Sequence, residues 1–235
     1  MAKFCFDLRE LTISNRNHTL MIEGINFTLE PPYRSMSLLA DSGIGKTTIF
    51  KSLFSKYIEL WSIEKPFRFE CNHSYDDSPF DNKDIQKNRI PISIGFASQF
   101  PYFLESQTGY QNIFAPLKWK KINWSEKKKG KHIELFCLQN IASRQLSILS
   151  GGERQLINIA RMLVLNPSIA IIDECFSSMN EQMAHTHINI LKDKFPNTLF
   201  LITSHRTNDI NSFSGKSLSL KRKQYKSGKF FVTQE

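Results

Sequence analysis

Short apolar runs alternate with amphipathic stretches along most of the chain. Several runs of mainly apolar residues have the length of buried strands: residues 35–40, 92–97, 169–173 and 199–204. Other stretches carry apolar residues at intervals of three and four, which is the spacing of one face of a helix: residues 46–56, 152–165 and 181–194. This alternation predicts an α/β domain with a mostly parallel sheet.

Strand-like patterns also occur outside this alternation. Residues 4–30 alternate between apolar and polar positions until Pro31 and Pro32, and residues 67–71 read as a strand within a polar, turn-rich segment. Residues 215–233 resemble a terminal hairpin that turns at Ser227-Gly228. We therefore expect an antiparallel β region at the N-terminus beside the parallel sheet.

The middle of the chain interrupts the strand–helix alternation. From Phe100 to about Leu149 the pattern is helical, with tryptophan, phenylalanine and leucine spread through it. We interpret residues 100–165 as a helical subdomain inserted into one domain that spans residues 1–235.

Length and composition are those of a folded protein: 235 residues, 40% hydrophobic and 23% charged. No apolar run approaches the ~18–20 residues that cross a bilayer. The first residues show no charged segment followed by an apolar one. We therefore expect a cytoplasmic protein whose membrane contact is peripheral or made through a partner.

The formal net charge is +9, which favours acidic partners. The basic residues form two clusters: Lys127, Lys128, Lys129 and Lys131, and Lys221, Arg222 and Lys223 with Lys226 and Lys229 nearby. A solvated face, a surface toward anionic lipid and a nucleic-acid site are all open interpretations. The last is the least favoured, because no aromatic-rich nucleic-acid motif accompanies the charge.

A glycine-containing loop lies between the strand at 35–40 and the helix at 46–56. It reads Ala-Asp-Ser-Gly-Ile-Gly-Lys-Thr-Thr and matches a phosphate-binding loop, except that Ala40 stands where the first glycine is usual. Glycines let the backbone turn its N–H groups toward phosphate oxygens, and the helix N-terminus adds partial positive charge. The predicted nucleotide contacts are Ser42, Gly43, Ile44, Gly45, Lys46, Thr47 and Thr48. Lys46 should reach the β- and γ-phosphates, and the Thr47 hydroxyl should bind Mg²⁺.

Two acidic residues follow the apolar run at 169–172. Asp173 and Glu174 stand at the carboxyl end of a predicted strand, where ligands bind in open α/β sheets. Asp173 is expected to hold Mg²⁺ through water, and Glu174 to act as the general base on the attacking water.

A third motif, Leu-Ser-Gly-Gly-Glu-Arg-Gln at residues 149–155, opens the helix at 152–165. It closely resembles the signature motif of ABC ATPases. The resemblance implies that Ser150, Gly151 and Gly152 form an anion site for the γ-phosphate of ATP held by the opposite subunit.

Further residues fall in the order of that family. Gln99 follows the strand at 92–97, as does the glutamine that senses Mg²⁺ and the attacking water. His205 follows the strand at 199–204 and matches the switch histidine at the γ-phosphate. Tyr110 to Ile113 resembles the family segment downstream of the glutamine. The resemblance therefore implies Lys46, Gln99, Glu174 and His205 as catalytic residues.

The resemblance implies an ATPase with ATP and Mg²⁺ as its ligands. The pattern is similar to stand-alone subunits of lipoprotein-release, macrolide-efflux or cell-division complexes, and small importers stay open. We expect head-to-tail pairing with a second copy, separate transmembrane permease subunits, and a peripheral position at the cytoplasmic face of the membrane. The alternative is a soluble ABC ATPase acting on nucleic acid or ribosomes. Intact Lys46, Asp173, Glu174 and His205 argue against a non-hydrolysing regulatory module.

Two features depart from the family pattern. The region where an aromatic residue usually stacks on adenine falls near Arg16 to His18, which contains no Phe, Tyr or Trp; Arg16 or His18 would stack less strongly. Asn180 stands where the family has an aspartate that joins the two halves of the dimer. An amide keeps hydrogen bonding but loses charge, so we expect slow but real hydrolysis.

The missing aromatic predicts modest discrimination between ATP and GTP. Phosphate and Mg²⁺ contacts are the same for both nucleotides, so without a stacking platform the base adds little selectivity. A competition assay should give a preference for ATP below about 100-fold, which corresponds to less than about 2.7 kcal/mol. A larger preference would show that another group recognises adenine.

Overall fold

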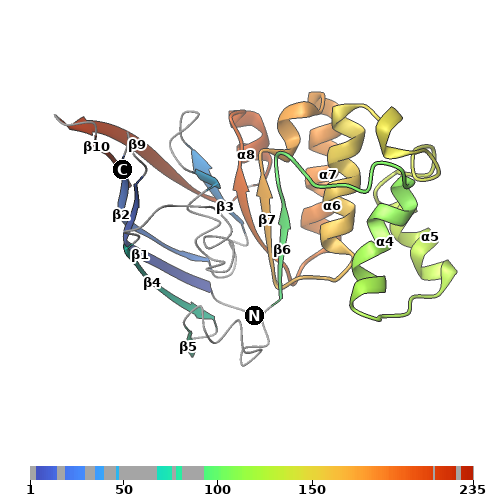
Figure 1. Ribbon diagram of the computed structural model, residues 1–235, viewed down its shortest axis with the longest axis horizontal. Helices are drawn as coiled ribbons and strands as arrows, with labels where there is room; N and C mark the ends of the chain where they lie inside the picture. The colour runs from blue at the N-terminus through green and yellow to red at the C-terminus, as the bar shows by residue number, and fades with distance from the viewer. Residues whose placement is uncertain are drawn as a thin grey trace. The chain divides into compact units, whose positions relative to one another are not determined.

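The computed structural model (Figure 1) describes residues 4–14, 19–29, 35–39, 46–47, 68–75, 78–80, 93–213, 215–225 and 229–234. Its internal contacts divide the chain into two units. The first contains residues 1–92 and 215–235, and the second contains residues 93–214. Each unit is described by itself.

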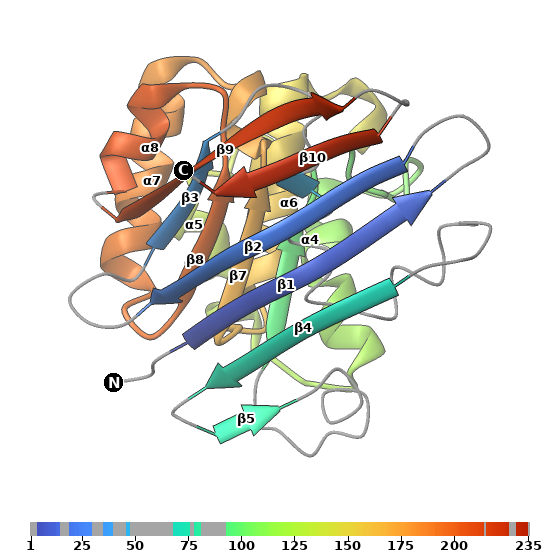
Figure 2. The ribbon, with the colours of Figure 1, turned by 90° about the vertical axis from the view of Figure 1, so that its left-hand side faces the viewer.

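The first unit contains the sheet order β5-β4-β1-β2-β10-β9-β3. Its strands are β1 (Phe4–Ser14), β2 (Thr19–Leu29), β3 (Ser35–Leu39), β4 (Arg68–Tyr75), β5 (Ser78–Phe80), β9 (Lys216–Tyr225) and β10 (Lys229–Gln234). Neighbours pair antiparallel except β10 with β2 and β9 with β3, and β4, β1, β2 and β10 lie side by side in Figure 2. The predicted antiparallel region and terminal hairpin are confirmed; the predicted turn at Ser227-Gly228 lies outside the described residues.

The second unit contains three parallel strands in the order β8-β7-β6. They are β6 (Ile94–Ala97), β7 (Ile169–Asp173) and β8 (Leu199–Thr203). Every residue of β7 and β8 is buried, which explains their continuous apolar sequence, since parallel strands are covered on both faces. The mostly parallel α/β architecture predicted from the sequence is confirmed.

Helices pack against these parallel strands and against one another. They are α4 (Gly109–Trp119), α5 (Glu126–Leu135), α6 (Gly151–Leu163), α7 (Glu181–Lys194) and α8 (Thr207–Phe213), with 3₁₀ turns η1 (Leu146–Ile148) and η2 (Cys175–Ser178). Four of these helices begin with an N-cap residue whose side-chain oxygen accepts a hydrogen bond from a backbone N–H group. They are Thr108 for α4, Ser125 for α5, Ser150 for α6 and Asn180 for α7. In Figure 1, α6 packs on β6 and β7.

The helical part of the second unit is packed around aromatic rings. Phe136 is fully buried, with ring centroids 5.1 Å from His132 and 6.0 Å from Phe195. Burial lowers the pKa of His132, whose Nε2 lies 2.9 Å from the Ala160 carbonyl. Residues 93–214 form a unit that includes the predicted helical subdomain, whose limits at 100 and 165 stay a prediction. Among the described residues, no helix is long and apolar enough to cross a membrane.

The packing around Phe136 predicts a large effect of truncation. Phe136→Ala should lower the free energy of unfolding by about 3–5 kcal/mol, because it removes buried area and leaves a cavity. Phe100→Ala is the matched control, since that ring is 85% exposed. Urea unfolding of both variants measures the difference. A loss below about 1 kcal/mol for Phe136→Ala would contradict this account of the core.

Candidate functional site

The two ends of the predicted phosphate loop have the expected backbone. Strand β3 precedes it, and Lys46 and Thr47 are helical, with Lys46 buried. The intervening residues 42–45, together with Arg16 and Thr48, lie outside the described residues. The strand before these residues and the helical backbone after them are the flanks that a phosphate-binding loop requires.

Asp173 and Glu174 stand where β7 ends. Asp173 is 2% exposed, and Thr203 Oγ1 donates a 2.7 Å hydrogen bond to its Oδ1. The same threonine accepts from the Glu174 backbone N–H, at its carbonyl (3.1 Å) and its hydroxyl (3.0 Å). One residue of β8 thus orients both acidic residues.

Glu174 has a backbone φ of 54°, in the left-handed region that non-glycine residues seldom adopt. Such a conformation costs on the order of 1 kcal/mol or more and concentrates at functional sites. It turns the chain directly from β7 into η2. The Glu174 side chain is thereby held at the carboxyl end of the sheet instead of continuing the strand.

His205, which follows β8, contacts Glu174 directly. Its Nε2 lies 2.7 Å from Glu174 Oε1, and the two side chains are 38% and 11% exposed. A half-exposed imidazole against a mostly covered carboxylate is accessible to a ligand on one side. The structure therefore brings together the predicted general base and the predicted switch histidine.

The predicted signature turn forms the start of α6. Ser150 is the N-cap residue: its Oγ accepts from the Glu153 N–H, while Glu153 Oε2 accepts from the Ser150 N–H at 2.8 Å. The backbone and hydroxyl of Ser150 lower the pKa of Glu153, and Arg144 contributes less. A carboxylate is thus stabilised at the start of α6, which agrees with the partial positive charge of a helix N-terminus.

Gly152 lies against the loop that follows Glu174. A Cβ at this position would be 3.1 Å from the Ser178 carbonyl oxygen and 3.6 Å from Met179 Cα. At Gly151 the nearest such contact is 3.8 Å, to Ser178 Cβ. The second glycine of the motif therefore permits a close approach between the start of α6 and η2.

Polar side chains of α6 hold the segment that contains Gln99. Gln155 Nε2 donates to the Gln99 carbonyl at 2.7 Å, and Asn158 Nδ2 donates to the Ser98 carbonyl at 3.0 Å. Asn158 also contacts the Sγ of Cys175, whose pKa is raised by burial. The Gln99 side chain itself is exposed, so the backbone is fixed and the amide is accessible to a ligand.

The aromatic residues after Gln99 differ in their burial. Phe100 and Tyr102 are exposed, but Phe103 is buried. Its ring lies between two guanidinium groups, with Arg161 at 4.5 Å and Arg154 at 5.4 Å from its centroid. Burial lowers the pKa of Arg161 to about 10. Phe103 therefore belongs to the core and not to an exposed groove.

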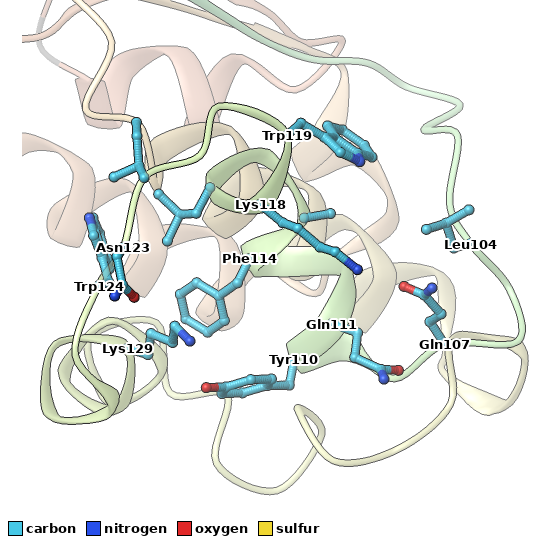
Figure 3. A pocket seen from close by; sticks show the side chains of 13 residues that line it. Leu104, Gln107, Tyr110, Gln111, Phe114, Lys118, Trp119, Asn123, Trp124 and Lys129 are labelled. Carbon is cyan, nitrogen blue, oxygen red and sulfur yellow. The ribbon is translucent and has the colours of Figure 1, made fainter.

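A groove of about 440 Å³ lies beside α4 (Figure 3). Its lining includes apolar side chains of Leu104, Trp119 and Ile122, all of them exposed, and the basic side chains of Lys118 and Lys129. Tyr110 also lines it, and its hydroxyl donates to Glu126 Oε2 at 2.5 Å. Phe100 and Tyr102 are not among the lining residues, so the groove involves Trp119 but not those two rings.

Three residues that the sequence interpretation missed hold the site together. Thr203 ends an apolar run, and Asn158 is a polar residue between Ile157 and Ile159, a signal that could have marked it. Arg206 follows His205 and carries no pattern of its own. Among the described residues, no three His, Cys, Asp or Glu side chains form a cluster that could hold a metal by itself.

Comparison with known proteins decides the family. Residues 22–177 match the family model described as ABC transporter. The chain belongs to the ABC transporter family. It is an ABC ATPase, and ATP and ADP are the nucleotides of this family. The matched range includes the phosphate loop, Gln99, the signature turn and both acidic residues, whereas Arg16 and His205 lie outside it.

Relatives and solved structures agree with this membership. The ABC ATPase is 31% identical over 202 residues to the lipoprotein-releasing system ATP-binding protein LolD of Treponema denticola, covering 82% of this chain and 84% of that protein. It is 25% identical over 230 residues to the probable ABC transporter ATP-binding protein p29 of Mesomycoplasma hyorhinis (93% and 88% covered). A dimeric structure of the ABC transporter cassette MJ0796 has the same fold, with a TM-score of 0.69, 20% identity, and 97% and 96% covered.

The loop after Glu174 ends at Asn180, directly before α7. Asn180, which replaces the aspartate of the family pattern, is the N-cap of α7, and its Oδ1 accepts from the Met183 N–H at 2.8 Å. The amide oxygen performs this capping without a charge. The substitution therefore preserves the start of α7.

Proposed function

We propose that this ABC ATPase is the energy-supplying subunit of a membrane transporter or transporter-like complex. ATP would close it head-to-tail against a second nucleotide-binding subunit, here a second copy of the chain, and hydrolysis would reopen the pair. The observation that carries the proposal is the 2.7 Å contact between Glu174 and His205, beside buried Asp173 and at the carboxyl ends of β7 and β8.

Glu174 is the proposed general base. Its carboxylate is fixed at one oxygen by His205 and by a backbone that Thr203 restrains, so it is oriented before a water molecule arrives. His205, at 38% exposure, can turn between this carboxylate and the γ-phosphate. The hydrolysis step is proton removal from water by Glu174, attack of that water on the γ-phosphorus, and departure of ADP.

The remaining proposed residues bind the nucleotide and its metal. Lys46 neutralises phosphate charge, and residues 42–48 supply backbone donors, with Arg16 against the base. Thr47, Gln99 and Asp173 present hydroxyl, amide and carboxylate oxygens, which are the ligands that Mg²⁺ prefers. This donor set fits an ion that takes its other ligands from phosphate and water, and the ion would supply positive charge at the β- and γ-phosphates.

The signature turn is the proposed site for the other subunit's nucleotide. Ser150, Gly151 and Gly152 open α6, and the partial positive charge of a helix N-terminus favours an anion there. In a head-to-tail pair this turn faces the partner's phosphate loop. The fold likeness to a dimeric cassette structure supports such pairing.

The groove beside α4 is the proposed contact with the membrane partner. It follows Gln99 in the chain and combines an exposed Trp119 with Lys118 and Lys129, which suits a short amphipathic helix of a separate permease subunit. The chain would then sit peripherally at the cytoplasmic face of the membrane. Import, export or mechanical work is set by that permease, and relatives named for lipoprotein release and for methionine import leave the choice open.

Replacing Glu174 tests the catalytic part of the proposal. Glu174→Gln should lower ATP turnover by about 100-fold or more, because an amide cannot take the proton, while ATP binding and nucleotide-dependent dimer closure remain. Glu181→Gln, an exposed glutamate in the first turn of α7, should keep wild-type turnover. Phosphate release and light scattering with ATP measure both properties. Undiminished hydrolysis in Glu174→Gln removes this residue from the role of base.

Membrane fractionation tests the partner. The tagged chain should sediment with membranes of cells that contain its permease and remain in the supernatant when the permease is absent. Trp119→Asp should reduce the sedimented fraction at least about threefold, since it places a charge where an apolar contact is expected. The control is Ile148→Ala, because Ile148 is also an exposed apolar residue but lies outside the groove. Salt-sensitive binding to RNA or DNA without membrane association would instead favour an ABC ATPase that acts on nucleic acid.

A further inference from the structure

Arg206 joins the two loops that carry the proposed catalytic pair. Its Nη1 donates to the Met179 carbonyl at 2.8 Å and its Nη2 to the Phe176 carbonyl at 2.5 Å. Its Nε donates to Asp209 Oδ2 at 2.9 Å. The guanidinium therefore spans from the loop after β8 to η2, the turn that begins directly after Glu174.

The Arg206 contacts form a closed polar network. The Asp209 carboxylate is buried and also accepts from Ser204 Oγ at 2.9 Å, while that hydroxyl accepts from the Arg206 N–H at 3.0 Å. Phe176 lies within η2 and Met179 is its C-cap residue, so both carbonyls belong to the turn that follows Glu174. A planar fork with several fixed donors can satisfy two carbonyls and one carboxylate together, which an ammonium group cannot do in this geometry.

Arg206 comes directly after His205 in the chain, and its two carbonyl partners come after Glu174. The Thr203 hydrogen bonds join the ends of β7 and β8 before Glu174 and His205, and Arg206 joins the same two loops after them. Along both chain segments, the residues of the 2.7 Å contact between His205 and Glu174 therefore stand between the hydrogen bonds of Thr203 and those of Arg206. The ring of His205 is half-exposed, so the backbone on both sides determines where it points.

We propose that Arg206 is a positioning residue for ATP hydrolysis, which holds the His205 loop against η2 and so sets the imidazole against the Glu174 carboxylate. Gly152, in contact distance of Ser178 and Met179, extends the same connection to the signature turn. The inference rests on the roles proposed above for Glu174 and His205. It adds a residue that acts on hydrolysis through the positions of Glu174 and His205.

Substitution of Arg206 should affect turnover more than nucleotide binding. Arg206→Gln should lower kcat roughly 10- to 100-fold, the scale expected from a small misplacement of catalytic groups, with KM for ATP within about threefold. Arg206→Lys keeps the positive charge but loses the planar guanidinium. Its kcat should lie between that of Arg206→Gln and that of the wild type. Lys192→Gln is the matched control: Lys192 also ties its helix to a carbonyl, that of Ser212 at 2.8 Å, away from η2. Its kcat should be unchanged.

A double-mutant cycle separates positioning from general support of the fold. If Arg206 acts through His205, Arg206→Gln should cause little further loss of single-turnover rate in a His205→Ala background. A wild-type kcat in Arg206→Gln overturns the inference. So does a double mutant whose fold-loss of single-turnover rate equals the product of the two single-mutant losses. Should Arg206→Gln fail to fold, Arg206→Lys decides, and wild-type kcat in that variant overturns it.

The same measurements distinguish this inference from the proposed function. If Glu174→Gln and His205→Ala both keep wild-type turnover, the catalytic roles fail and the inference falls with them. If both lose turnover while Arg206→Gln keeps it, the proposed function stands and only the role of Arg206 is rejected.

Discussion

A carboxylate buried at the end of a parallel strand needs a hydrogen-bond donor, and in this ABC ATPase Thr203 is that donor. The parallel register pairs Asp173 with Thr203, so the hydroxyl reaches the carboxylate at 2.7 Å and also receives the Glu174 N–H. An unpaired buried carboxylate would cost several kcal/mol. A shift of one residue between β7 and β8 would send the threonine side chain to the opposite face. The orientation of both acidic residues therefore depends on this register.

Helix α6 links that strand end to the rest of the site. Its polar residues Gln155 and Asn158 hold the carbonyls of residues 98–99, and its first turn lies against η2 through Gly152. Gln99, the signature turn and the loop after Glu174 are thus fastened to one helix. A displacement of any of them strains the others, because packed interiors resist continuous deformation. These contacts connect residues 98–99, the signature turn and the loop after Glu174 within residues 93–214.

The loop between β7 and α7 combines strain with strong local restraints. Glu174 adopts a left-handed conformation, which is tolerated because its N–H is held by Thr203 and η2 follows at once. Asn180 ends the loop by capping α7. The loop is therefore fixed at both ends by hydrogen bonds from backbone N–H groups to side-chain oxygens, and a neutral amide suffices at Asn180.

The sequence alone determined those features that rest on short-range patterns. The limits of α7 and β7 agree with the predicted 181–194 and 169–173, because hydrophobic period and helix caps act within a few residues. Asp173 and Glu174 were found because they end an apolar run, and the family because its motifs are contiguous in sequence.

Only the tertiary structure decided which residues hold these motifs in place. Asn158 donates to a carbonyl 60 positions earlier and Arg206 to one 30 positions earlier, and neither partner can be inferred from local spacing. Phe103 reads like its exposed neighbours Phe100 and Tyr102, yet folding buries it between Arg154 and Arg161. Contacts of this kind arise from the packing of whole elements, so sequence pattern predicted the candidate reacting groups and the fold selected the side chains that orient them.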